Sequence, residues 1–115
     1  HTAYRNFEHF STPFCLVGHT HIPVVFTLDE EHERAEPLLP PLAEPVELGP
    51  QRAIINPGSV GQPRDGDPRA SYALLDTDEM TWEFRRVSYP ISITQERMRA
   101  KGLPQRLIDR LQMGR

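Results

Sequence analysis

The sequence is poor in cysteine and has no long hydrophobic run. Cys15 is the only cysteine in 115 residues, so no disulfide forms within the chain, and this composition fits a reducing compartment. No stretch resembles a signal peptide or a membrane-spanning helix, so we expect a cytoplasmic protein that makes no membrane contact. The net charge of −3 comes without a basic cluster and therefore gives no indication of specific nucleic-acid binding.

Apolar residues are also scarce for a chain that must build its own core. They make up 37% of the sequence, and the chain begins with His1 instead of a methionine. Twelve prolines are present, of which five lie between Pro37 and Pro50. These features lead us to expect a piece of a longer protein, with a proline-rich surface excursion in its first half.

Hydrophobic patterning predicts an α/β chain with more strand than helix. Ser92 and Gln95 fit a capping box at the start of a helix that Gly102 ends, and Pro104 begins another helix. The segment 29–36 is either an acidic metal or partner patch or a solvated hairpin tip, and we favour the tip. The other expected elements are a helix over 1–10, strands at 14–17, 24–28 and 53–55, and a short strand at 46–48 within an otherwise irregular 37–50. Strands at 70–76 and 81–87 are expected to pair as a β-hairpin, and alternation along the second strand places Trp82, Phe84 and Arg86 on one face.

Two histidines follow the first expected strand directly. The apolar run 14–17 leads into Gly18, then His19 and His21 stand one residue apart, and Pro23 closes the turn. A loop just past the carboxyl end of a buried strand is where ligands collect in open α/β folds. Two imidazoles suit a transition metal, although a complete site needs at least one or two more ligands.

A second loop follows the strand at 53–55 and is rich in turn-forming and polar residues. Its candidates are Asn56, Gly58, Ser59 and Arg64. Glycine permits close backbone approach, exposed N–H groups bind anions, and an arginine can hold a phosphate oxygen. An ordinary tight turn between strands explains the composition equally well. Taken with the histidine loop, the pattern indicates metal-assisted phosphate chemistry.

The motif Gly18-His19-Thr20-His21 after an apolar strand resembles the last motif of the calcineurin-like metallophosphoesterases. The run from Asn56 to Arg64 resembles the loop that follows it in their small bacterial and archaeal phosphodiesterase branch. The resemblance implies a four-layer α/β/β/α sandwich, of which this chain supplies mostly the second sheet with flanking helices. It also implies two divalent metal ions (Mn, Fe, Zn or Ni), with His19 on one and His21 on the other, and a metal-activated water that attacks phosphorus. The residues Asn56, Gly58, Ser59 and Arg64 would then support the histidine loop or the substrate.

The earlier motifs of that family are absent from this sequence. It contains no Asp-x-His, no Gly-Asp-x-x-Asp and no Gly-Asn-His-Asp/Glu, which supply the other ligands. We therefore expect residues 1–115 to be the carboxyl-terminal part of a single metallophosphoesterase domain, with 29–50 as an acidic, proline-rich excursion. The complete protein would hydrolyse a phosphodiester or phosphomonoester, and this part alone would be inactive.

Uncovered sheet edges in such a part predict a partner, which is either the missing amino-terminal half or a second copy of the chain. Two other functions stay open. One is a phosphoesterase-like interaction scaffold without catalysis, and the other is an unrelated small β-rich binding domain with incidental histidines.

Overall fold

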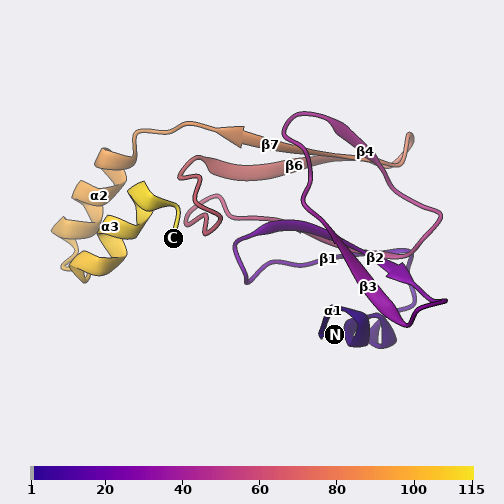
Figure 1. The fold of residues 1–115 in the computed structure, drawn as a ribbon. Coiled ribbons are helices and arrows are strands. Elements are labelled where there is room, and N and C mark those ends of the chain that lie inside the picture. Colours follow the sequence, from indigo (N-terminus) through magenta and orange to yellow (C-terminus); the bar gives the residue numbers. More distant parts are fainter. Residues whose placement is uncertain (1) are drawn as a thin grey trace.

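The computed structural model describes residues 2–115 and consists of stacked layers. A short helix α1 (Thr2–Asn6), continued by the 3-10 turn η1 (Phe7–His9), covers a four-stranded sheet, and a three-stranded sheet lies on the other side (Figure 1). Two further helices follow the last strand. The expected mixed α/β architecture with two sheets and flanking helices is confirmed, although the chain contributes strands to both sheets.

The four-stranded sheet brings the ends of two distant segments together. Its order is β1 (Phe14–Leu16), β5 (Ala53–Pro57), β2 (Pro23–Asp29) and β3 (Arg34–Leu38). β1 runs parallel to β5, with Phe14 opposite Ala53, whereas β2 is antiparallel to both of its neighbours. Because parallel strands share the edge at which they end, the loops after β1 and β5 emerge side by side.

The three-stranded sheet has the order β4 (Pro45–Glu47), β7 (Thr81–Val87) and β6 (Ala70–Asp76). β6 and β7 form the predicted hairpin with the predicted bounds, from Ala70 opposite Val87 to Asp76 opposite Thr81. The alternation along β7 places Trp82 and Phe84 on the buried face, as predicted. Between the sheets lies a core made by Val25, Leu48, Ala53, Ile55 and Trp82.

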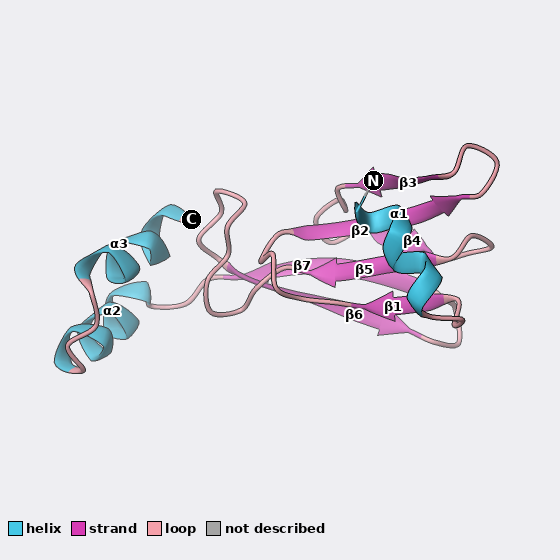
Figure 2. Ribbon diagram, turned by 90° about the horizontal axis from the view of Figure 1, so that it is seen from below, coloured by secondary structure: helices cyan, strands magenta, loops and turns pink. Residues whose placement is uncertain are grey.

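The outer face of the four-stranded sheet is covered only in part. Phe7 of η1 packs against Leu28 and Ile54, and Figure 2 shows α1 lying across the strands. Arg52 fastens this end of the chain, because its guanidinium donates to the carbonyl oxygens of Phe7 and Phe10 and lies 4.6 Å from the centre of the Phe10 ring. Beside the helix, the same face carries an apolar groove of about 720 Å³.

The helices α2 (Ile91–Ala100) and α3 (Gln105–Met113) pack against each other beyond the ends of the strands (Figure 1). The predicted capping box is wrong: Pro90 is the N-cap, and no side chain caps the helix. Gln95 is buried instead, and its amide donates to the carbonyl oxygen of Ile108 at 2.8 Å. A buried amide needs a hydrogen-bond partner, and the carbonyl oxygen of Ile108 supplies one at the interface of the two helices. The Gln95 side chain therefore points to α3 and does not cap α2. Gly102 ends α2 with φ of 69°, as predicted.

Several predicted boundaries are also corrected. The strands expected at 14–17, 24–28 and 53–55 occupy Phe14–Leu16, Pro23–Asp29 and Ala53–Pro57, so Asn56 lies in a strand and not in the loop after it. The helix expected over 1–10 ends at His9, where Phe10 is extended, and His1 lies outside the described residues. Strand β3 occupies Arg34–Leu38, so the hairpin tip shrinks to four residues and Pro37 belongs to a strand. A proline is tolerated there because β3 is an edge strand. The short strand of the excursion begins at Pro45, one residue early. Within residues 2–115, no helix reaches the length and apolar character that a bilayer crossing requires.

Candidate metal-binding loop and the loop that supports it

The histidine loop joins β1 to β2 and has an unusual backbone. His19 is exposed and has φ of 76°, and His21 is half-buried and has φ of 62°. Left-handed backbone is uncommon for residues other than glycine, and it persists where surrounding contacts enforce it. Two such residues in one short loop therefore call for structural support from neighbouring segments.

Asn56 supplies the first part of that support. It is the fourth residue of β5 and is 2% exposed. Its amide nitrogen donates to the carbonyl oxygen of Gly18 at 3.0 Å and to the hydroxyl of Thr20 at 2.9 Å. Its amide oxygen accepts from the backbone N–H of Gly58 at 2.9 Å. One buried side chain thus binds the residues on both sides of His19, through the backbone of Gly18 and the side chain of Thr20.

Two residues of the second loop hold His21. The imidazole Nδ1 lies 2.7 Å from the carbonyl oxygen of Gln62, and the N–H of Arg64 donates to the carbonyl oxygen of His21 at 3.1 Å. A carbonyl oxygen only accepts, so Nδ1 carries the proton and Nε2 keeps its lone pair. This is the hydrogen bond through which proteins orient a metal-binding imidazole.

Gly58 and Ser59 shape the second loop. Gly58 has φ of 83°, and a Cβ at this position would collide with the hydroxyl of Ser71 and come within 3.3 Å of Pro23. The Ser59 hydroxyl accepts from the N–H of Gln62 at 3.0 Å, and its carbonyl oxygen accepts from Ser71 at 2.9 Å. Gly58 thus allows the close approach of Ser71, and Ser59 binds the backbone of Gln62, the residue whose carbonyl contacts His21.

Arg64 is the one candidate of this loop whose side chain reaches solvent. Its guanidinium donates to the side-chain oxygen of Gln62 at 2.9 Å. It forms no ion pair with a carboxylate of residues 2–115. An exposed guanidinium next to a histidine loop has free donors for an anion.

The donor set fits part of a transition-metal site. Imidazole nitrogen is a ligand that Zn, Fe, Ni and Mn accept, and the fixed tautomer of His21 leaves Nε2 for coordination. Within the part of the chain that the structure describes, no group of three or more histidine, cysteine, aspartate or glutamate side chains is placed to bind a metal ion. Any metal held here would need further ligands from outside residues 2–115.

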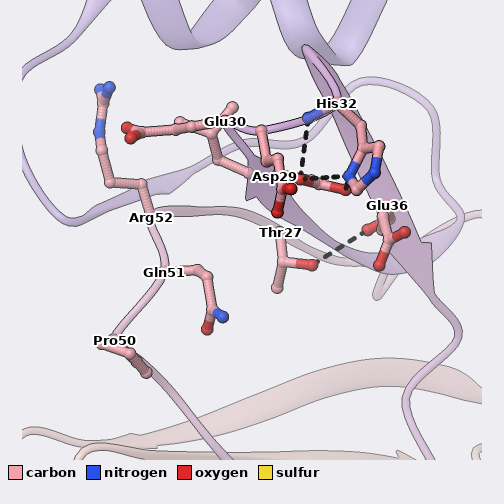
Figure 3. Close-up of a pocket in the computed structure, with 10 residues that line it drawn as sticks. Thr27, Asp29, Glu30, His32, Glu36, Pro50, Gln51 and Arg52 are labelled. Carbon is pink, nitrogen blue, oxygen red and sulfur yellow. Dashed lines mark hydrogen bonds and ion pairs between the residues drawn. The ribbon is translucent and has the colours of Figure 1, made fainter.

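The acidic segment forms a separate pocket at the far end of β2, where the segment 30–33 turns into β3 (Figure 3). Asp29 accepts from the backbone and imidazole of His32 and from Arg34. Partial burial acts to raise the pKa of the Asp29 carboxyl, but these hydrogen bonds outweigh burial and lower it. Asp29 and Glu36 thus pair with local basic groups, an arrangement that fits a solvated hairpin tip.

Sequence reasoning did not single out Thr20, Gln62 or Arg86. Thr20 and Gln62 lie inside the two candidate loops, but Gln62 acts through its backbone carbonyl, which any residue possesses. The alternation along 81–87 places Arg86 on the face that Trp82 and Phe84 share and gives it no role. An arginine on an apolar face was the available signal, since a buried arginine requires hydrogen-bond or ion-pair partners.

Comparisons with known proteins agree with this fold. A crystal structure of a metallophosphoesterase from Sphaerobacter thermophilus is 48% identical and superposes with a TM-score of 0.92 over 99% of this chain and 47% of that protein. An uncharacterized protein of Methanocaldococcus jannaschii is 40% identical over 100 residues, which are 87% of this chain and 39% of that protein. The chain therefore spans less than half the length of either relative.

The sequence profile of the calcineurin-like phosphoesterase superfamily domain matches residues 2–80, which include both loops. This match and the crystal structure set aside an unrelated β-rich binding domain. The chain belongs to the calcineurin-like phosphoesterase superfamily.

Proposed function

We propose that this chain is the carboxyl-terminal part of a metal-dependent phosphoesterase that hydrolyses a phosphodiester or a phosphomonoester. The orientation of His21 is the observation that carries the proposal. Its Nδ1 is bonded to the Gln62 carbonyl oxygen, so Nε2 is available to a metal ion in a family of phosphoesterases.

The residues of the two loops have different proposed roles. His19 and His21 would each bind one of two divalent ions (Mn, Fe, Zn or Ni). When bound, such ions supply an activated water and stabilise the charge that develops on a phosphate. Arg64 would hold a phosphate oxygen, because its guanidinium is exposed and has no acidic partner among residues 2–115. Asn56, Gly58 and Ser59 would support the two loops.

The other ligands would come from the amino-terminal half of the domain, which we propose as the partner of this chain. β1 is an edge strand, and an apolar groove of about 480 Å³ lies between β1 and β6, lined in part by Leu16, Val17, Tyr72, Leu75 and Trp82. Leu16 is 60% exposed there. Because both relatives are more than twice as long as the matched part, a covering segment of the same domain accounts for this surface better than a second copy does.

A cytoplasmic location also remains our proposal. It rests on the single cysteine, Cys15, which is half-buried and has no disulfide partner in the chain.

The test uses the longest natural form of the protein, purified without chelator. We expect about two Mn, Fe, Zn or Ni ions per chain by elemental analysis and hydrolysis of a generic phosphodiester. The His19→Ala/His21→Ala double variant should lose both. A matched double variant at exposed histidines outside the loop, His9→Ala/His32→Ala, should keep both.

Absence of metal from the wild type, with no hydrolysis and no effect of the double variant, would overturn the proposal. That result would favour the interaction scaffold. Metal binding without hydrolysis of any phosphoester would overturn the enzymatic half of the proposal and leave the ligand assignment intact.

A further inference from the structure

Arg86 lies at the end of β7 and is the most deeply buried charged side chain that forms an ion pair among residues 2–115, with 3% of its side chain exposed. Its guanidinium pairs with the carboxylates of Asp65 and Asp67. It also donates to the carbonyl oxygens of Asp67 and Arg69, each at 3.0 Å. The guanidinium carbon lies 5.2 Å from the centre of the Phe84 ring. All of its polar partners belong to one segment, 65–69.

That segment continues directly from the residues that hold His21. Gln62 and Arg64 contact the imidazole and the carbonyl oxygen of His21, and Asp65 is the next residue along the chain. No helix or strand occurs between β5 and β6, so nearby contacts alone fix the path of residues 58–69. Arg86 supplies the largest group of them, since a planar guanidinium binds several oxygens in a fixed arrangement.

The other contacts of this segment are local or lie at its ends. Arg69 donates to the Asp67 carboxylate within the segment, and Gly66 donates to the carbonyl oxygen of Gly114 at 3.0 Å. Pro63 is fully buried beside Gln62, but none of these contacts involves the Asp65 side chain. Without the guanidinium, Asp65 would lose its only ion-pair partner among the described residues, and the carbonyl oxygens of Asp67 and Arg69 would lose their buried donor.

We propose that Arg86 is a positioning residue for the metal ligand His21, because it anchors segment 65–69 and thereby holds the Gln62 carbonyl and the Arg64 amide against His21. The consequence is a fixed Nδ1–H tautomer with Nε2 directed away from the second loop. This inference rests on the proposed function only where it concerns metal affinity. The tautomer itself is a property of the chain without metal.

The first measurement is the tautomer of His21 in the metal-free protein. Long-range proton–nitrogen NMR at pH 8, on the longest natural form, shows which ring nitrogen carries the proton. We expect Nδ1–H in the wild type. In Arg86→Met we expect a mixture in which Nε2–H predominates, since that is the favoured form of a free imidazole in water.

The second measurement is metal affinity by competition with a chelator, with Mn²⁺ and Co²⁺ as probes. Loss of an outer hydrogen-bond partner lowers affinity by about 10- to 100-fold, and we expect Arg86→Met to fall in this range. Arg86→Lys keeps the charge without the planar fork and should recover only part of the affinity. Arg85→Met is the matched control: Arg85 is the neighbouring residue on β7, is 42% exposed and pairs with Glu83, so its loss should change neither readout.

Asp65→Asn is a second, milder variant that tests the same contact if Arg86→Met does not fold. It weakens the contact to Arg86 at a site that is 21% exposed and leaves the other partners of the guanidinium in place. Folded Arg86→Met or Asp65→Asn protein with the wild-type tautomer and the wild-type affinity would overturn the positioning role while the proposed function stands. A tautomer that shifts in these variants, in a protein that binds no metal even as wild type, would support the positioning role and overturn the proposed function.

Discussion

The Nδ1 atom of His21 and the carbonyl oxygen of Gln62 are 2.7 Å apart, although 41 residues of chain separate them. This contact joins the two loops that follow the parallel strands β1 and β5. It also decides which imidazole nitrogen is free. The orientation of the His21 imidazole therefore depends on the second loop, which lies far from it in the sequence.

Replacement of Asn56 tests how far the loops depend on buried polar contacts. Asn56→Ala removes the donors to Gly18 and Thr20 and leaves the N–H of Gly58 without its acceptor. We expect the free energy of unfolding to fall by about 2–4 kcal/mol in chemical denaturation. Asn6→Ala is the control, because Asn6 is exposed and makes one local bond; it should cost less than about 0.5 kcal/mol. Equal effects of the two variants would contradict the role given to Asn56.

Replacement of Gly58 by alanine tests the backbone geometry of the second loop. In Gly58→Ala the new methyl group meets the Ser71 hydroxyl at a residue whose φ is 83°. We expect a loss of more than about 2 kcal/mol in the free energy of unfolding, from left-handed strain and overpacking together. Gly61→Ala adds the same methyl group where no atom lies within 4 Å and should be nearly neutral. A Gly58→Ala protein as stable as Gly61→Ala would show that the loop adjusts freely.

Replacement of Leu16 by alanine tests whether the amino-terminal half covers the edge of β1. In the longest natural form, Leu16→Ala should lower the free energy of unfolding by about 2–3 kcal/mol, as expected of a buried leucine. Leu103, which is 43% exposed and lies just before α3, gives the control, and Leu103→Ala should cost less than about 1 kcal/mol.

A second copy as the covering partner would give a different result. The protein would be a dimer by analytical ultracentrifugation, and the effect of Leu16→Ala would vary with protein concentration. That outcome, or equal effects of Leu16→Ala and Leu103→Ala, would contradict cover by the amino-terminal half.

The lowered pKa of Asp67 predicts that the protein loses stability in acid. The hydrogen bonds from the Arg69 side chain, aided by the charge of Arg86, lower the pKa of the Asp67 carboxyl to about 2. A carboxyl with a lowered pKa stabilises the fold above its ordinary pKa of 3.8, and this contribution disappears as the pH falls from about 4 to 2. Its size is at most about 2 kcal/mol, since solvent reaches part of the pair.

Unfolding of Asp67→Asn at two pH values measures this contribution. The variant should be less stable than the wild type at pH 7, and the difference should nearly vanish at pH 2. Asp78→Asn, an exposed aspartate in the turn between β6 and β7, should show a small difference that does not vary in this way. A difference for Asp67→Asn that is the same at both pH values would refute the assignment.

The hairpin of β6 and β7 shows what local sequence can predict. Alternating apolar residues define both strands, and the turn residues between them leave one register, so its bounds agreed with the prediction. The strand Arg34–Leu38 was missed for the opposite reason: its charges and proline are tolerated only because it lies at an edge. Whether a strand lies at an edge depends on the whole fold.

The supporting contacts of the candidate site were harder to predict than its histidines. His19 and His21 stand out because of their chemistry and spacing, and Asn56 because a polar residue directly follows the apolar run 53–55. Gln62 contributes a backbone carbonyl, and the sequence does not say where a carbonyl points. Ser92 and Gln95 satisfied a capping pattern, but tertiary burial of Gln95 against α3 decided the actual contact.

The left-handed backbone at positions 19 and 21 also limits how this loop can change during evolution. Apart from glycine, asparagine tolerates such backbone best, and a histidine codon becomes an asparagine codon by one nucleotide change. Under the proposed function, a lineage that no longer needs a metal can therefore replace both histidines by point mutation and still keep the turn. A β-branched residue such as valine would strain this backbone. Relatives without metal binding should consequently carry Asn or Gly at these two positions.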